Sequence, residues 1–192
     1  MRQPARRGAG FSLVELMVTI AVLAILLAIG IPSFASLIAA NRLTSATNEL
    51  VASLQTARTE AIRRNARITV CPAAPTATAC SGNWRDGWMV FLDQTPGNAP
   101  APESANDILF RGGPLPAGIV AVANAPLSSY ASFTADGASK QLNGAFLAGT
   151  LRVCSISTAL TNDRRARDLV LIASGRIVLT TPTGVASTCP SP

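Results

Sequence analysis

The sequence predicts an α+β protein in which a long N-terminal helix packs on a head of antiparallel β-sheet. Three observations support this prediction. A mostly apolar run occupies residues 11–31, a helical pattern of apolar residues follows it to about residue 65, and short β-prone runs between Gly- and Pro-rich loops fill the rest of the chain. Because no long helical run separates these later segments, antiparallel pairing is favoured over β-α-β crossovers.

Composition narrows the function classes. The chain has 192 residues, of which 48% are hydrophobic and 14% charged, so it is too apolar for a disordered protein. It contains no histidine, which excludes His-based catalytic triads, bases and metal ligands. The net charge of +6 comes from three arginines before the apolar run and from residues 150–192, since residues 11–149 are neutral. We therefore expect a protein that is not an enzyme and holds no cofactor or metal.

The run from residue 11 to residue 31 is long enough to cross a membrane. As a helix it would span about 32 Å, which matches a hydrocarbon core of about 30 Å. Arg2, Arg6 and Arg7 precede it, so the positive-inside rule puts the N-terminus in the cytoplasm and the head outside. The run is longer than the core of a cleaved signal peptide, and the small residues 8–10 come before it rather than after it.

Glu15 is an ionisable residue near the start of this apolar run. In one interpretation it lies one turn from the helix start, reaches the headgroups and favours the positive end of the helix dipole. In the other it meets a cation inside the bilayer when subunits pack, and a free α-amine at Phe11 of a neighbouring subunit would be such a cation.

The segment Gly10-Phe11-Ser12-Leu13-Val14-Glu15, followed by the apolar helix, resembles the class III signal of type IV pilins and type II secretion pseudopilins. The resemblance implies that a prepilin peptidase cleaves between Gly10 and Phe11 and that Phe11 is then N-methylated. It also implies that Glu15 is needed for assembly, and that Pro32 marks a helix kink. A proline within a helix is expected to interrupt it locally.

Four segments follow from these observations. We expect a prepilin leader at 1–10, a transmembrane helix at 11–33, an amphipathic stalk helix at 34–65 and a β-rich periplasmic head at 66–192. The stalk shows apolar residues at spacings of three and four, with polar residues between them. These apolar positions are Leu43, Ala46, Leu50, Leu54 (or Val51), Ala57 and Ala61.

The head contains seven β-prone runs and a tight turn. We expect the turn at Ser174-Gly175, between the last two runs. We also expect Trp84, Trp88 and Phe91 to be core or sheet residues. The predicted strands are Arg67–Cys71, Trp88–Leu92, Ile108–Arg111, Ile119–Val122, Leu151–Cys154, Leu169–Ala173 and Arg176–Thr180.

The four cysteines are expected to form disulfides, because the head is predicted to be extracytoplasmic and no Cys-x-x-Cys pair or histidine suggests zinc. Four cysteines allow three pairings. We favour Cys71–Cys80, which a short proline-containing loop joins, and Cys154–Cys189, which would hold the tail on a strand. Free buried thiols are the alternative.

The acidic residues of the head offer a weaker candidate site. Asp86, Asp93 and Asp107 carry the oxygen ligands that calcium prefers. Their spacing is not that of an EF-hand, and Asp in loops of a β-rich domain more often forms turns. We therefore treat them as turn formers, with calcium binding as the alternative.

The head carries a second resemblance. The segments LVASLQTARTEAIRRNARITVCP, CSGNWRDGWMVFLD and ILFRGG resemble the type II secretion protein H / FimT-like minor pilin group. This implies a pilin-like fold and a structural subunit of a type II secretion pseudopilus or a type IV pilus. It also implies the prepilin peptidase, other pilin or pseudopilin subunits and the inner membrane as partners, with a single-pass subunit in that membrane.

DNA binding is the alternative function. Some FimT-like minor pilins bind DNA for natural transformation through a Gly-Arg-x-Arg motif. Gly175-Arg176-Ile177-Val178 resembles this motif in its first half only, because Val178 stands at the position of the second arginine. Arg164, Arg165 and Arg167 lie just upstream and would add phosphate contacts that depend on salt.

Overall fold

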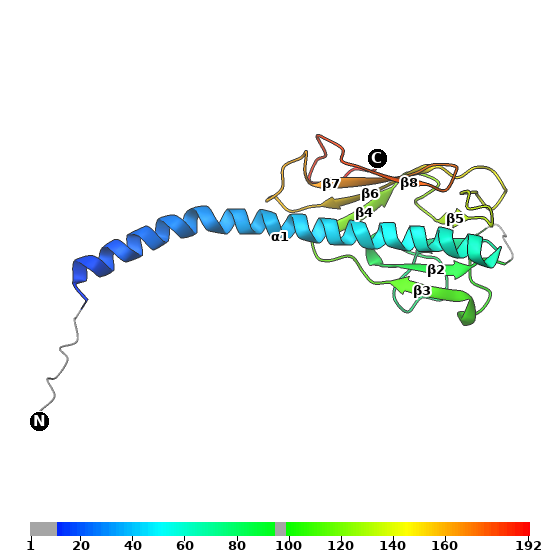
Figure 1. Ribbon diagram of the computed structural model, residues 1–192, viewed down its shortest axis with the longest axis horizontal. Helices are drawn as coiled ribbons and strands as arrows, with labels where there is room; N and C mark the ends of the chain where they lie inside the picture. Colours follow the sequence, from blue (N-terminus) through cyan, green and yellow to red (C-terminus); the bar gives the residue numbers. More distant parts are fainter. Residues whose placement is uncertain (1–10, 95–98) are drawn as a thin grey trace, which may run out of the picture. The chain divides into compact units, whose positions relative to one another are not determined.

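The computed structural model describes residues 11–94 and 99–192 (Figure 1). One long helix is followed by eight strands and two short 3-10 helices. The chain divides into two compact units, with the boundary between Leu37 and Ile38. In order, the elements are α1 (Leu13–Arg64), β1 (Ile68–Pro72), η1 (Trp84–Asp86), β2 (Trp88–Leu92), η2 (Ala105–Asp107), β3 (Ile108–Gly112), β4 (Ile119–Ala123), β5 (Ala131–Phe133), β6 (Gly149–Ser155), β7 (Ala166–Leu171) and β8 (Ile177–Thr180).

Helix α1 joins the predicted transmembrane and stalk segments without a break. The interruption expected at Pro32 is absent, because residue 32 lies inside continuous helix. A proline removes only one backbone donor from the helical ladder, and the hydrogen bonds on both sides of it can hold the helix together.

The C-terminus of α1 lies where the sequence predicts it. Helix α1 ends at Arg64, and Asn65 adopts a positive φ of 50°. The backbone N–H of Asn65 donates to the carbonyl of Ile62, and that of Ala66 donates to the carbonyl of Ala61. This is the Schellman pattern, in which a left-handed residue satisfies the last carbonyls of a helix and turns the chain away.

The second half of α1 buries the predicted apolar stripe. Val51 is only half-buried, so Leu54 is the residue that occupies that turn of the stripe. The buried positions are Leu43, Ala46, Leu50, Leu54, Ala57 and Ala61, each at most 3% exposed. Small alanines at three of these six positions let the backbone of α1 come close to the strands that it covers.

Two antiparallel four-stranded sheets complete the head. The first sheet has the strand order β3-β2-β1-β5, and the second has the order β4-β6-β7-β8. Both sheets contribute to one core with α1, through residues such as Val70 and Trp88 from the first sheet and Leu151 and Leu169 from the second. The α+β fold predicted from the sequence is therefore correct.

Each sheet also has an outer face with a small cluster of its own. Met89 and Phe91 on the outer face of the first sheet pack around Cys71, while Ala166 on the second sheet and Val185 in the segment after β8 pack around Cys154. Each cluster includes one cysteine pair. The disulfides therefore fasten loop segments to faces of the sheets that α1 does not cover.

All seven predicted strands occur, with ends that shift by up to three residues. The structure adds β5, which pairs with β1 through Ile68↔Phe133 and Val70↔Ala131. The turn at Ser174-Gly175 also occurs: Gly175 has a φ of 76°, and its N–H donates to the carbonyl of Ile172. Trp84, Trp88 and Phe91 are buried, as the sequence predicts.

Candidate assembly and interaction sites

The N-terminus of α1 is capped by a side chain. Ser12 precedes the first helical residue, and its Oγ accepts a hydrogen bond of 3.2 Å from the backbone N–H of Glu15. Its carbonyl accepts a bond of 3.2 Å from the N–H of Leu16. Ser-x-x-Glu is the sequence signature of a capping box, and that pattern would have identified this cap from the sequence.

Glu15 therefore lies in the first turn of α1, where a carboxylate favours the positive end of the helix dipole. It is exposed, and among residues 11–94 and 99–192 no basic side chain lies within ion-pair distance of it. Phe11, the predicted methylation site, is 71% exposed, whereas Gly10 lies outside the described residues.

The first half of α1 exposes its apolar side chains. An 18-residue window of the helix has a mean hydropathy of 2.7 and none of it is buried. By length and composition this segment can cross a membrane. The absence of burial distinguishes it from the core helix of a soluble domain, because a core helix would cover these side chains.

The arginines considered for DNA binding do not form one surface. Arg165 is only 5% exposed, and its guanidinium bonds inside the protein. It donates to Oδ1 of Asn162 and to the carbonyls of Ser155, Ser157 and Leu160. This corrects its assignment as a phosphate contact, because these acceptors already occupy its donors.

The other three arginines lie at two ends of one strand. Arg164 is exposed at the start of β7, and Arg167 is half-buried, with its Nη1 2.7 Å from the carbonyl oxygen of Ala166. Arg176 is exposed beyond the turn that follows β7. About 17 Å of strand separates Arg167 from this turn, so the four residues do not act as a cluster.

Gly175, the glycine of the half-motif, has a packing role. A Cβ at this position would lie 1.9 Å from the carbonyl oxygen of Gly137. Arg58 of α1 contacts both of the segments that meet here. Its Nε donates to the carbonyl of Gly137 at 2.9 Å, and its Nη2 donates to the carbonyl of Ser174 at 3.4 Å. The sequence predicts only a polar position of the stalk helix at Arg58, because no motif marks a contact between Arg58 and the distant Gly137.

The cysteines form two disulfides, Cys71–Cys80 and Cys154–Cys189, and these are the pairs that the sequence favours. The Cα atoms are 5.6 Å apart in the first pair and 6.0 Å in the second. The second closes a segment of 35 residues and holds the chain end on the outer face of the second sheet. Arg152 holds the same tail through a bond of 3.0 Å to the carbonyl of Pro190.

Arg152 also forms the most buried ion pair of the head. Its Nε and Nη2 lie 2.7 and 2.8 Å from the two carboxylate oxygens of Asp168, on the neighbouring strand. The hydrogen bond to Asp168 raises the pKa of Arg152. This bidentate geometry has a structural purpose, since both side chains are almost covered.

The acidic residues considered for calcium serve local structure. Oδ2 of Asp107 accepts from both the backbone N–H and the hydroxyl of Ser104, which lowers the pKa of Asp107 and closes a capping box on η2. Asp93 is 2% exposed, and burial raises its pKa although Oδ2 accepts a bond from the Thr69 hydroxyl. Oδ1 of Asp93 has no partner among the described residues.

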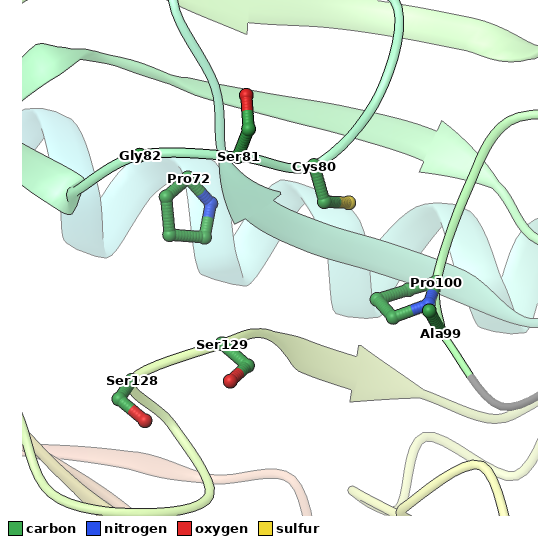
Figure 2. Close-up of a pocket in the computed structure, with 8 residues that line it drawn as sticks. All are labelled: Pro72, Cys80, Ser81, Gly82, Ala99, Pro100, Ser128 and Ser129. Atoms are coloured by element: carbon green, nitrogen blue, oxygen red, sulfur yellow. The ribbon is translucent and has the colours of Figure 1, made fainter.

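A hollow of about 280 Å³ lies beside the first disulfide (Figure 2). Proline rings and serine residues line it, and none of the described side chains around it is charged or aromatic. Among the described lining residues, the serines have no neighbouring base of the kind that activates a nucleophile. The lining residues are Pro72, Cys80, Ser81, Gly82, Ala99, Pro100, Ser128 and Ser129.

Comparison with solved structures finds the same fold. Two crystal forms of the type IV minor pilin FimU of Pseudomonas aeruginosa (strain PAO1) match this chain at 23% identity. The match to the P21 form has a TM-score of 0.55 and covers 75% of this chain and 95% of FimU; the match to the P65 form has a TM-score of 0.51 and covers 73% and 98%. Comparison with curated proteins gave no match.

Two family models match the sequence. The prokaryotic N-terminal methylation motif covers residues 5–31, which include the capped start of α1 and its exposed apolar half. The model of the type II transport protein GspH covers residues 46–175, from the buried half of α1 to the turn before β8. This second match spans more than half of the chain and includes every strand of the two sheets except β8. The chain therefore belongs to the GspH family of pilin-like minor pilins and pseudopilins.

Proposed function

We propose that this chain is a minor structural subunit of a type II secretion pseudopilus or a type IV pilus, inserted and assembled through the first half of α1. The observation that carries the proposal is the combination of a capped helix start, with Glu15 in its first turn, and a following helix whose apolar side chains are all uncovered. Such a surface is stable only in a bilayer or against other apolar helices.

In this proposal a prepilin peptidase cleaves between Gly10 and Phe11, and Phe11 is then methylated at its new amino group. Residues 11–33 cross the inner membrane once, with the N-terminus in the cytoplasm and the head in the periplasm. Glu15 pairs with a cation in the bilayer when subunits pack, because a carboxylate without a partner is costly there. The oxidised cysteine pairs support the periplasmic location of the head.

The experiment that tests this proposal expresses the chain with a prepilin peptidase and with the other pilin-like subunits. Mass spectrometry of the product should show a chain that begins with methylated Phe11. A Glu15→Ala chain should be processed and folded, yet absent from isolated fibres, while Glu49→Ala should enter them normally. Efficient incorporation of Glu15→Ala, or a chain that retains residues 1–10, would contradict the proposal.

The same experiment distinguishes a type II secretion pseudopilus from a type IV pilus. The chain is co-isolated with the major pseudopilin in one case and with the major pilin in the other. We do not extend the proposal to DNA binding, because Arg165 is buried and Arg164 and Arg176 lie at opposite ends of β7.

A further inference from the structure

Strand β8 is an open edge of the second sheet. It pairs with β7 on one side, and it is the last strand in the order β4-β6-β7-β8. Edge strands offer free N–H and C=O groups to another chain, and proteins usually protect them with charges, prolines or a covering segment. From Ile177 to Thr180 the strand carries no charged side chain and no proline, so it lacks two of these protections.

The register shows which backbone groups are free. Val170 faces Val178 and Leu171 faces Ile177, and the hairpin begins with the bond from the N–H of Ile172 to the carbonyl of Arg176. Bonded and non-bonded pairs alternate along an antiparallel ladder, so Val178 bonds to β7 and Ile177 and Leu179 turn their N–H and C=O groups outwards. No other described residue bonds to these outward groups.

The side chains of Ile177 and Leu179 share a face with Leu169 and Leu171, which belong to the core. Ile177 is only half-buried, and Leu179 is 48% exposed. The inner face of the second sheet therefore continues beyond the part that α1 covers. The partly exposed apolar side chains of Ile177 and Leu179 therefore lie next to the free edge.

A groove accompanies this edge. We call it the β8 groove; its volume is about 390 Å³, and it is lined by Gln55, Arg58, Thr59 and Ile62 of α1 and by Gly175, Arg176 and Ile177. Ile62 is 52% exposed, which makes the side of the groove formed by α1 partly apolar as well. Each side of the groove thus carries one large apolar side chain among polar ones, Ile62 on α1 and Ile177 on β8, and unpaired backbone groups border the side formed by β8.

The charge of the β8 groove is positive. Arg58 and Arg176 are the ionisable residues that line it, and neither forms an ion pair with any carboxylate of the described residues. Arg58 is partly committed to the carbonyls of Gly137 and Ser174, whereas Arg176 is exposed. A ligand that complements this groove has apolar side chains along the edge and a carboxylate beside Arg176.

We propose that the β8 groove binds an extended segment of another protein chain, which adds to the second sheet as an antiparallel strand next to β8. Such a segment bonds to the backbone of Ile177 and Leu179. It places apolar side chains at alternate positions in the groove and carries an acidic residue C-terminal to them, opposite Arg176. The inference goes beyond the proposed function and does not depend on processing, membrane insertion or assembly.

A strand fits these observations better than a nucleic acid does. A duplex is held by many phosphate contacts, and the β8 groove offers two guanidinium groups, one of which already donates to two carbonyls. It also lacks aromatic side chains on which single-stranded bases could stack. Free N–H and C=O groups beside apolar side chains are what an added β-strand requires.

The test uses the full chain in detergent micelles and a labelled synthetic peptide of alternating valine and threonine that ends in glutamate. Fluorescence polarisation should show saturable binding. Leu179→Lys places a charge beside the free edge, on the face of β8 that Leu179 shares with Ile177, and should weaken binding at least about tenfold, whereas Val178→Lys, on the opposite face of β8, should change it less than about twofold. Unchanged circular dichroism and melting temperatures confirm that both variants are folded.

Two further comparisons separate strand addition from other binding. A peptide N-methylated at alternate residues cannot form the ladder, and it should not bind. Arg176→Glu should weaken binding of the glutamate peptide at least about fivefold and favour a peptide that ends in lysine. The proposal is overturned if the first peptide does not bind at millimolar concentration, if the methylated peptide binds equally well, or if only a DNA oligonucleotide binds in a manner that Arg176→Glu abolishes.

Discussion

Nε of Arg58 lies 2.9 Å from the carbonyl oxygen of Gly137, and this bond joins α1 to the turn that follows β5 of the first sheet. Through Nη2 the same guanidinium reaches the carbonyl of Ser174, in the turn between β7 and β8. One side chain therefore connects α1 with turns from both sheets. Gly175 allows these turns to approach each other.

This junction predicts a large cost for Gly175→Ala. Gly175 has a φ of 76°, and its added Cβ would meet the carbonyl of Gly137, so we expect a loss of about 2–4 kcal/mol in the free energy of unfolding. Gly184→Ala is a matched control, because Gly184 also has a positive φ of 69° but no atom within 4 Å of an added Cβ. It should cost about 1–2 kcal/mol, from the backbone conformation alone. Urea unfolding followed by fluorescence of the buried tryptophans measures both, and equal costs would refute the close approach.

The Arg152–Asp168 pair should behave as a buried ion pair. Asp168→Ala leaves the guanidinium of Arg152 without its carboxylate, and the free energy of unfolding should fall by about 3–5 kcal/mol. The double variant Arg152→Met/Asp168→Leu removes both charges and should recover most of this loss. A double-mutant cycle by urea unfolding supplies the coupling energy. Additive single and double variants would show that the two groups do not depend on each other.

The buried carboxyl of Asp93 predicts a pH dependence with a definite sign. Burial raises the pKa of Asp93 in the folded state, so the unfolded chain loses this proton at lower pH than the folded chain. The contribution of Asp93 to stability is therefore fully present below its unfolded pKa of about 3.9 and is lost as the pH rises through the folded pKa.

The variant Asp93→Asn tests this sign. It keeps an acceptor for the Thr69 hydroxyl without a buried charge, so it should be more stable than the natural chain at pH 7, with a difference that shrinks towards pH 3. Melting curves across this range give the comparison. Asp136→Asn is the control: hydrogen bonds to Thr134 and Ala138 lower the pKa of Asp136, and the variant should lose stability at pH 7 rather than gain it. A constant difference between Asp93→Asn and the natural chain at all pH values would contradict the expectation.

The two disulfides should differ in their contribution to stability. The chain-entropy model assigns about 4 kcal/mol to a loop as long as that of Cys154–Cys189 and about 2.5 kcal/mol to one as short as that of Cys71–Cys80. The sequence separations are 35 and 9 residues. Paired Cys→Ala replacements, one disulfide at a time, test this order by urea unfolding under non-reducing conditions. A larger loss from the short loop would show that packing of the outer cluster of the first sheet outweighs loop closure.

Much of the fold follows from periodic patterns. Leu43 to Ala61 are predicted because spacings of three and four place these residues on one face of a helix, and the structure buries that face. The hairpin at Ser174-Gly175 is predicted because glycine readily supplies a positive φ. Strand β5 is missed, since Ala131-Ser132-Phe133 is too short to show an alternation and is a strand only because β1 pairs with it.

The hydrogen-bond partners of the arginine side chains were less predictable than the strands. The sequence treats Arg164, Arg165 and Arg167 alike, as exposed cations upstream of Arg176. Only the folded loop shows that carbonyls from residues 155–160 surround the guanidinium of Arg165. Likewise, Arg58 and Gly175 are far apart along the chain, and their common contact with Gly137 follows from packing that no local pattern records.

The attachment of the tail by Cys154–Cys189 has a consequence for peptide mapping. Trypsin cleaves after Arg176, and residues 177–192 contain no further arginine or lysine, so Cys189 stays in the peptide that begins at Ile177. Without reduction this peptide stays joined to residues 153–164, whereas Cys71 and Cys80 fall within the single peptide 68–85. One digest of the oxidised protein therefore identifies both disulfides. Cys154–Cys189 gives the mass of two joined peptides, and Cys71–Cys80 gives one peptide that is lighter by two hydrogens. Either alternative pairing would join the peptide 68–85 to another peptide.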